Sequence, residues 1–303
     1  MTAETSAKTR CIAVPCPLCT SDDFDPIHTE ETTYFEQPIS LRIVRCRKCQ
    51  MVYTNPRLAE VNMAYEERET LDPQYIEHHM KTKQPVFTQA LHRLQSLCPA
   101  PARVIDIGCG VGGFLSVARK AGYDVVGIEP SPVDAQHARE ELDLIVHDTL
   151  FEKAELEANS FDMVTLWDVI EHVENPRGIV RRSAEVLRPG GWVVMRMPGA
   201  TFHRFKARIL GLWAGPSAVV YSPVIHLSFF SSQTIRRLLT EEGFDRIQVR
   251  LTPCEWNSST WIANLLRASW HAGASILARL TGIHLDNLEV YARRVPSNGS
   301  KDV

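Results

Sequence analysis

From about residue 102 to about residue 295, short apolar runs alternate with longer segments in which apolar residues recur every three or four positions. The short runs predict buried strands, and the longer segments predict amphipathic helices. We expect strands at residues 103–107, 124–129, 144–147, 161–167, 192–197, 244–251 and 288–293. Strands that alternate with helices at such short intervals are typical of an α/β domain with a doubly wound, mostly parallel sheet.

Boundary signals place the helices between these strands. Ser131 followed by Pro132 is a helix start, because serine caps free backbone N–H groups and proline fits the first helical turn. Asn175-Pro176 begins another helix, which we expect to end at Pro189-Gly190. A serine at 231 or 232 begins a third, which Gly243 ends.

Two further zones precede this domain. Residues 11–60 carry two cysteine pairs among short strand-like runs, and residues 61–101 are a helical linker or lid that ends in a proline-rich turn. Within the domain at 102–295, residues 255–286 form a helical insertion rich in tryptophan. That insertion could cover a pocket mouth, form a homodimer contact or lie on a membrane surface. Packing or dimerisation is the simpler interpretation.

Composition and charge narrow the class of protein. The 303 residues are 44% hydrophobic with a net charge of -3, which is globular and lacks the cationic excess that makes nucleic acid a favoured partner. The polar first ten residues do not resemble a signal peptide, so we expect a cytoplasmic protein with reduced thiols. The apolar stretch at 261–280 contains Arg267, His271 and Arg279, which argues against a transmembrane helix.

A glycine-rich turn follows the first predicted strand, in the sequence Asp106-Ile107-Gly108-Cys109-Gly110-Val111-Gly112-Gly113. Glycines let a ligand approach the backbone, and the following helix N-terminus offers free N–H groups, so the turn suits a nucleotide-like ligand. The same glycines fit G-x-G-x-x-G, with Glu129 about 20 residues further on, as in dinucleotide-binding enzymes. Asp106 favours a different ligand, because a carboxylate there repels a pyrophosphate and attracts the ammonium group of a methionine moiety.

Acidic residues also stand at the ends of the next three strands. Glu129 ends the second strand, Asp148 follows the third and Asp168 follows the fourth. Because open α/β sheets bind ligands at the carboxyl ends of their strands, we expect these acids to line one rim with Asp106. Asp148 could accept from an adenine amino group, and Asp168 would lie near the methionine end. A helix cap or a solvated loop explains either of these two equally well.

Five motifs in order resemble those of the class I S-adenosylmethionine (AdoMet)-dependent methyltransferases: Val104-Ile105-Asp106-Ile107-Gly108-Cys109-Gly110, Gly127-Ile128-Glu129-Pro130-Ser131, Phe161-Asp162-Met163-Val164, Trp167-Asp168-Val169-Ile170-Glu171-His172-Val173 and Leu187-Arg188-Pro189-Gly190-Gly191. The resemblance implies a Rossmann-like, seven-stranded sheet with an antiparallel last strand, and AdoMet as the methyl donor. The binding residues that it implies are Asp106, Gly108, Gly110 and Gly112 for the methionine end, Glu129 for the ribose and Asp148 for the adenine.

The cysteine pairs Cys16/Cys19 and Cys46/Cys49 each have C-x2-C spacing. Four thiolates at such spacing suit a closed, tetrahedral zinc site, as in a zinc ribbon, and a site without an open position is structural. Zinc binding energies of roughly 10–16 kcal/mol are large compared with what a small core supplies, so the metal should decide whether this zone folds.

Methyl transfer to a hydroxyl or an acidic carbon requires a general base. The candidates are His172, just after the fourth strand, and Tyr221 and His226, which precede the helix that begins near residue 231. His226 is the leading candidate, because its surroundings resemble the site region of sugar C-methyltransferases. A structural role for His226 is equally open. The apolar segment at 199–226 is expected to cap an acceptor pocket.

The ribbon and the catalytic domain together resemble a group that includes deoxysugar C-methyltransferases and ubiquinone-type O-methyltransferases. We therefore expect a small-molecule acceptor, such as a sugar nucleotide, an isoprenoid or another metabolite, methylated at oxygen or carbon. Three alternatives stay open: an NAD-dependent oxidoreductase that uses the same glycine turn, an rRNA or tRNA methyltransferase whose ribbon binds RNA, and a binding module without activity.

Overall fold

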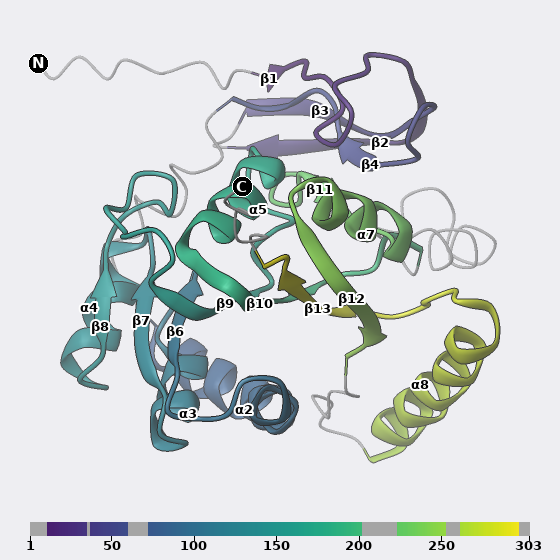
Figure 1. Ribbon diagram of the computed structural model, residues 1–303. Helices are drawn as coiled ribbons and strands as arrows, with labels where there is room; N and C mark the ends of the chain where they lie inside the picture. Colours follow the sequence, from purple (N-terminus) through teal and green to yellow (C-terminus); the bar gives the residue numbers. More distant parts are fainter. Residues whose placement is uncertain (1–10, 35–36, 60–71, 202–222, 253–260, 297–303) are drawn as a thin grey trace, which may run out of the picture.

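The computed structural model describes residues 11–34, 37–59, 72–201, 223–252 and 261–296 (Figure 1). A small N-terminal sheet lies above a large α/β domain, and one long helix stands at the lower right of the view. Tyr221 and most of the 199–226 segment, which was expected to cap the acceptor, lie outside the described residues.

The central sheet has seven strands: β6 (Arg103–Ile107), β7 (Asp124–Ile128), β8 (Ile145–His147), β9 (Phe161–Trp167), β10 (Leu187–Met197), β12 (Phe244–Leu251) and β13 (Leu288–Arg294). Their order is β12-β13-β10-β9-β6-β7-β8. β13 runs antiparallel to both of its neighbours, whereas β6 to β10 pair in parallel. The predicted seven-stranded, mostly parallel sheet with an antiparallel last strand is therefore confirmed.

Helices cover both faces of this sheet. On one face, α2 (Pro73–Leu97), α3 (Gly113–Lys120) and α4 (Pro132–Glu140) pack on Val104, Val125 and Val194. On the other face, α5 (Pro176–Val186) and α7 (Ser232–Glu241) pack on Ile105 and Val193. Successive residues of a strand point to opposite faces, so strands covered on both faces are mostly apolar, as the short apolar runs predicted.

The helix starts agree with the sequence signals. Ser131 caps α4 by accepting from the backbone N–H of Asp134, and Ser231 caps α7. The end of α5 differs, because the helix stops at Val186 rather than at Pro189-Gly190 and β10 begins at Leu187. Proline disfavours the helical conformation of the residue before it, and Leu187 is fully buried in an extended conformation, so the chain leaves the helix early.

The N-terminal sheet is built from β2 (Phe24–Tyr34), β3 (Gln37–Cys46) and β4 (Val52–Thr54), and β1 (Cys11–Ile12) pairs separately with β5 (Arg57–Leu58). A fourth strand, β11 (Ser228–Phe229), comes from the catalytic domain and pairs antiparallel with β4. Cys16, Cys46 and Tyr53 belong to the same buried cluster as the central sheet. The two parts of the chain therefore share a core and a sheet.

The last helix, α8 (Trp261–Thr281), lies between β12 and β13 in the sequence. In the part of the chain that the structure describes, no helix has both the length and the apolar composition needed to cross a membrane.

Candidate active site

A cavity of about 290 Å³ lies at the carboxyl ends of β6, β7 and β9. Open α/β sheets bind their ligands at this edge. Its lining comes from the glycine turn, the end of β7, the start of α4, the turn after β9 and α2. Its polar and charged lining residues include Lys83, Asp106, Glu129, Asp134, Asp168 and His172.

Two glycines of the turn open it toward the cavity. Gly108 has φ +65°, and an added Cβ would lie 2.7 Å from a methyl carbon of Val169, so a side chain would clash. Gly110, with φ +52°, has no atom within 4 Å of such a Cβ, so its backbone faces open space. The N–H of Gly108 donates to the carbonyl of Ile128 at 2.8 Å, which ties the turn to β7. The turn is a fixed cradle for a ligand that approaches the backbone.

Gly112 has a different surrounding from its neighbours. It is absent from the cavity lining, and a Cβ there would lie 2.6 Å from a methyl carbon of Leu144 and 3.2 Å from Ala138. The glycine at this position therefore allows the turn to pack closely against α4 and the start of β8.

Asp106 is buried beneath the cradle, with 1% of its surface exposed, and it accepts a hydrogen bond from Thr165 Oγ1 at 2.6 Å. Burial raises the pKa of Asp106 to about 8, and the hydrogen bond from Thr165 offsets only part of that rise. A carboxyl group in this environment gains a large electrostatic stabilisation from a cationic ligand, because the cation compensates the desolvated negative charge.

Glu129 is held in place by backbone groups of the same cradle. Its two carboxylate oxygens accept from the N–H of Gly110 at 2.8 Å and from the N–H of Ser131 at 2.9 Å. The side chain is 6% exposed and lines the cavity. Asp148 lies elsewhere, since it is absent from the lining, its side chain is 53% exposed and it pairs with Arg139 at 3.5 Å.

Asp168 joins three distant parts of the chain. Its carboxylate accepts from Lys83 Nζ of α2 at 2.9 Å and pairs with Arg196 of β10. Burial pushes the pKa of Asp168 upward, but the charges of Arg196 and Lys83 outweigh burial and hold the pKa below its ordinary value. Sequence reasoning missed both cations. Arg196 carried a signal, as the one charged residue in the apolar strand at 192–197, whereas Lys83 is one of many charged residues in its helix.

His172 also lines the cavity. Its Nδ1 lies 2.9 Å from the carbonyl oxygen of Ile225, so Nδ1 carries the donated proton and Nε2 is the acceptor of the neutral ring. Burial lowers the pKa of His172 and favours this neutral form. His226 is absent from the lining but packs on His172, with ring centroids 4.7 Å apart. Thr54 of the N-terminal sheet donates to the carbonyl of His226 at 2.8 Å.

Glu171 lies beside the two histidines and is 2% exposed. Burial and the charge of Asp168 raise its pKa well above the ordinary value, which favours a protonated side chain. Glu171, His172 and His226 each offer one ligand atom within 4.8 Å of the others, a spacing that could also hold a metal ion.

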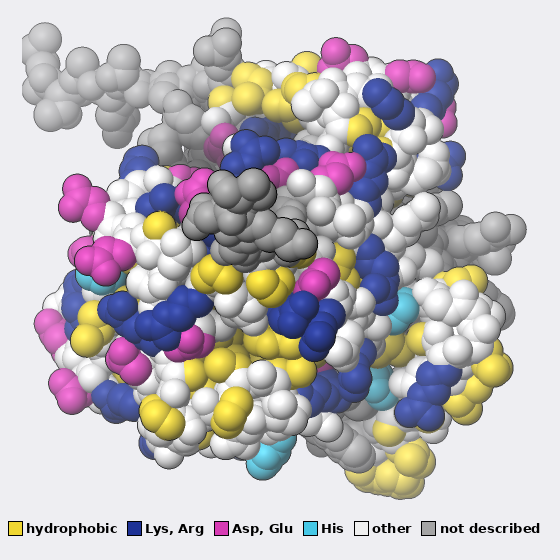
Figure 2. Space-filling model, viewed as in Figure 1, with side chains coloured by type: hydrophobic (Ala, Val, Ile, Leu, Met, Phe, Trp, Pro, Cys, Tyr) yellow, Lys and Arg dark blue, Asp and Glu magenta, His cyan; other side chains and the backbone are white. Residues whose placement is uncertain are grey.

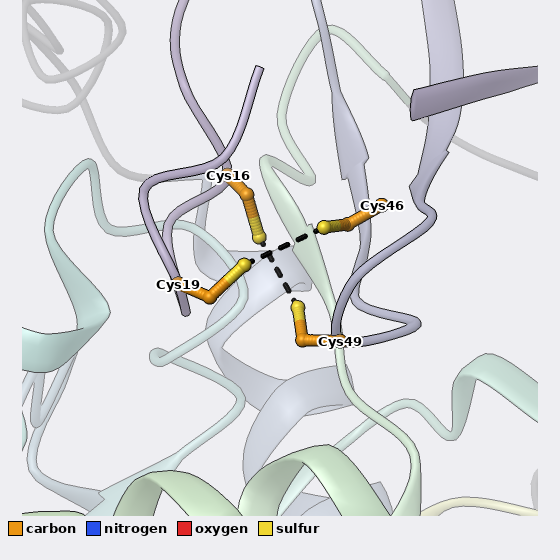
Figure 3. A group of neighbouring side chains, drawn as sticks. All are labelled: Cys16, Cys19, Cys46 and Cys49. Carbon is orange, nitrogen blue, oxygen red and sulfur yellow. Dashed lines mark hydrogen bonds between the residues drawn. The ribbon is translucent and has the colours of Figure 1, made fainter. Parts of the chain in front are cut away.

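The four predicted cysteine ligands meet in the N-terminal sheet (Figure 3). Cys16 and Cys19 come from the loop after β1, and Cys46 and Cys49 flank the turn between β3 and β4. The Sγ atoms of Cys16 and Cys49 are 3.4 Å apart, those of Cys19 and Cys46 are 3.5 Å apart, and all four lie within 4.8 Å of one another. Tetrahedral zinc with Zn–S bonds of about 2.3 Å places its sulfurs about 3.8 Å apart, so the cluster is compatible with zinc.

The sheet order, the glycine cradle and the buried acid beneath it are what an α/β enzyme with a cationic, nucleotide-like ligand requires. A family model described as a methyltransferase domain matches residues 76–249, which is more than half of the chain. The protein belongs to this family, the AdoMet-dependent methyltransferases. Family membership also decides against an oxidoreductase use of the G-x-G-x-x-G turn.

Curated relatives with the same domain include the ubiquinone biosynthesis O-methyltransferases of Xanthomonas axonopodis pv. citri, 36% identical over 121 residues, and of Bordetella avium, 40% identical over 116 residues. These matches cover 37% and 36% of this chain and 50% and 48% of the relatives. The chain therefore spans about half the length of the curated relatives that it matches.

Solved structures share the fold. An AdoMet-dependent methyltransferase from Archaeoglobus fulgidus superposes with a TM-score of 0.52 at 17% identity, over 74% of this chain and 100% of that one. A phosphoethanolamine N-methyltransferase from Haemonchus contortus, in complex with AdoMet, superposes with a TM-score of 0.51 at 18% identity, over 81% of this chain and 63% of that one. At such identities the likeness concerns the fold alone.

Proposed function

We propose that this protein transfers the methyl group of AdoMet to an oxygen atom of a small-molecule acceptor. The observation that carries the proposal is that the donor cradle and a histidine line the same cavity. The named activity of the ubiquinone biosynthesis relatives favours oxygen over carbon as the methylated atom. Within that class, a hydroxylated aromatic or isoprenoid metabolite is the acceptor that the relatives support.

On this proposal, the cradle binds the donor through charge and close approach. Asp106 faces the ammonium group of the methionine moiety, and Gly108 and Gly110 give the moiety access to the backbone. Glu129 accepts from the ribose hydroxyls, since backbone N–H groups already orient its carboxylate. Asp168 completes the methionine end, where Lys83 and Arg196 keep its carboxylate ionised.

His172 is the residue that we assign as general base. Its Nε2 is the acceptor of the neutral ring, and the ring lines the cavity, so it can take the proton of an acceptor hydroxyl as the methyl group is transferred. His226, the leading candidate from the sequence, supports His172 through ring contact. Tyr221 stays a prediction.

We further propose that the four-cysteine cluster binds structural zinc. The support is the proximity of Cys16, Cys19, Cys46 and Cys49, which leaves no position for a substrate. The ion would hold the turn between β3 and β4, and β4 in turn pairs with β11, two residues beyond His226.

The test is an acceptor screen with methyl-labelled AdoMet. Catechols with and without an isoprenoid tail, and sugar nucleotides, are incubated with the protein, and the labelled atom is identified by NMR. The proposal predicts label on oxygen of a phenol-type acceptor. Label on a carbon atom would contradict O-methylation and support C-methylation. If calorimetry detects no binding of S-adenosylhomocysteine, the proposal that AdoMet is the methyl donor is wrong as well.

A further inference from the structure

Glu171, His172 and His226 form a compact group of metal-binding side chains beside the cavity. Each offers one ligand atom, and the three atoms lie within 4.8 Å of one another. Zinc bonds of about 2.1 Å place tetrahedral ligands about 3.4 Å apart, so side-chain rotation would bring the three atoms onto one ion. Two imidazoles and a carboxylate suit zinc and similar transition metals, whereas Mg²⁺ and Ca²⁺ prefer oxygen ligands alone.

The carboxylate of Glu171 is the observation that indicates a ligand. The residue is 2% exposed, neither carboxylate oxygen accepts a hydrogen bond from the described residues, and Nε2 of His172 is 3.9 Å from Oε1, beyond hydrogen-bond range. Because burial removes its hydration, a carboxylate in such a place is normally hydrogen-bonded, paired with a cation or coordinated to a metal ion. The nearby cations Lys83 and Arg196 both pair with Asp168. A metal ion held by the two imidazoles would compensate the carboxylate directly.

Backbone hydrogen bonds hold together the two segments that carry this group. The carbonyl oxygen of Glu171 accepts from the N–H of Leu227 at 2.8 Å and from the N–H of Ser228 at 3.1 Å. Nδ1 of His172 lies 2.9 Å from the carbonyl oxygen of Ile225, in the same second segment. Main-chain pairing between the turn after β9 and the start of β11 therefore positions the three ligand atoms, so little ordering is needed when an ion binds.

The ring of His172 is oriented as in many metal sites. Histidines that bind a metal usually donate their other ring N–H to a carbonyl or a carboxylate, which fixes the tautomer. Nδ1 of His172 donates to the carbonyl of Ile225, so Nε2 carries the lone pair of the neutral ring. The same lone pair takes the proton when His172 acts as general base. A metal ion and the proton of the acceptor therefore compete for one nitrogen atom.

We propose that Glu171, His172 and His226 bind a divalent transition-metal ion such as Zn²⁺, and that the bound ion inhibits methyl transfer by occupying Nε2 of His172. The inhibition rests on the proposed role of His172 as general base, whereas the metal site does not. With the ion bound, an acceptor hydroxyl keeps its proton and stays a weak nucleophile. This site differs from the four-cysteine cluster, whose ion would be structural.

Titration of the full chain with Co²⁺ tests the site, because cobalt occupies zinc sites and its absorption spectrum reports the ligands. The four-cysteine cluster is first loaded with zinc. We expect one further equivalent of Co²⁺ to bind with weak visible bands and without the intense thiolate-to-cobalt absorption of a cysteine site. Surface histidines compete weakly, since on the face in Figure 2 they are separate spots and each offers a single ligand. Zn²⁺ should displace this cobalt and lower kcat by about a hundredfold, as loss of a general base does.

Glu171→Gln keeps the shape of the side chain and removes the charged ligand. We expect it to weaken binding of the second metal ion by about a hundredfold or more. Turnover should become resistant to zinc to the same extent, with each rate compared with that of the same variant without added metal. Glu174→Gln is the matched control, because Glu174 lies in the same turn and its carboxylate pairs with Arg57. It should bind cobalt as the natural protein does, and circular dichroism checks that both variants fold.

Three results would overturn the proposal in different ways. If the natural protein binds no second metal ion, or Glu171→Gln binds it equally well, the metal site is wrong and the role of His172 as general base is untouched. If zinc binds at this site and raises turnover, the inhibition is wrong, in favour of a metal-assisted reaction. If cobalt binds as expected but no acceptor is methylated, the proposed function and the inhibitory role are wrong, whereas the metal site stands.

Discussion

Two groups of residues that line the cavity are assembled in different ways. The first group, the donor side, comes from one short part of the chain, between Asp106 and Asp134, where a strand, a turn and the start of a helix follow one another. The second group, the second side, comprises Lys83 of α2 and the turn after β9, which carries Asp168 and His172, and Arg196 of β10 pairs with Asp168 from outside the lining. Through Asp168 the second side also reaches the proposed methionine end of the donor. Local contacts thus form the donor side, whereas long-range packing brings the second side together.

The N-terminal sheet belongs to the second side. The strand β4 pairs with β11, and Thr54 bonds to the backbone of His226, which packs on His172. The donor cradle, by contrast, is hydrogen-bonded to β7 and to the start of α4 rather than to the N-terminal sheet, among the contacts of the described residues. Disturbing the N-terminal sheet should therefore affect the two sides unequally.

Metal removal should produce the largest difference between the two sides of the cavity. Loss of a binding energy of roughly 10–16 kcal/mol should unfold the N-terminal sheet and release β11. We expect a strong chelator, or Cys46→Ser, to abolish turnover while the affinity for S-adenosylhomocysteine falls far less. Metal content, circular dichroism, a methyl-transfer assay and calorimetry measure the bound metal, the folding of the sheet, the turnover and the affinity, respectively. Cys98→Ser is the control, because Cys98 lies outside the cluster. Full turnover by the metal-free protein would contradict the link.

His172→Ala should lower kcat by about 10²- to 10⁴-fold, the usual contribution of a general base. The affinity for S-adenosylhomocysteine should change little, because the donor cradle is intact. Steady-state kinetics and calorimetry give the two values, with His147→Ala as the control at an exposed histidine of β8. In the unaltered enzyme, turnover should fall as the pH drops through the pKa of His172, which burial holds below its ordinary value. An unchanged kcat would return His172 to a structural role.

Asp106→Asn should weaken AdoMet binding by about a hundredfold, because the buried negative charge facing the ammonium group is lost. The same substitution should stabilise the folded protein in the absence of AdoMet. The folded-state pKa of Asp106 is raised from 3.8 to about 8, so the unfolded chain releases the proton at lower pH and stability falls as the pH rises across that range. Thermal unfolding at pH 5 and pH 7.5 should show this loss for the natural protein and less of it for Asp106→Asn. Identical pH profiles would exclude this role of Asp106.

Asp148→Asn should have the smallest effect, about twofold or less on AdoMet affinity. Asp148 is half-exposed, lies outside the cavity lining and pairs with Arg139, and exposed pairs contribute at most about 1 kcal/mol. Calorimetry with AdoMet at matched salt measures it, with Arg139→Gln as a control for the ion pair. A tenfold loss confined to Asp148→Asn would instead support the adenine contact that the family resemblance implies.

Much of the fold was predictable because its signals are local. Apolar runs marked the seven strands, Ser131-Pro132 marked the start of α4, and the order of motifs implied the antiparallel last strand. The end of α5 was placed too late, since the burial of Leu187 in β10 outweighed the proline and glycine that follow. The Lys83–Asp168 contact was not predictable, because its residues are 85 positions apart and no periodicity connects them.

The sequence by itself determined the class of the protein, since the glycine turn, Asp106 and Glu129 lie in one short segment whose spacing sets their geometry. It also determined which four cysteines could meet, through their C-x2-C pairs. Only the tertiary structure decided that His172, rather than His226, faces the cavity, and that the N-terminal sheet extends through β11 into the catalytic domain. Such contacts depend on how separate elements pack, which the pattern along the chain does not encode locally.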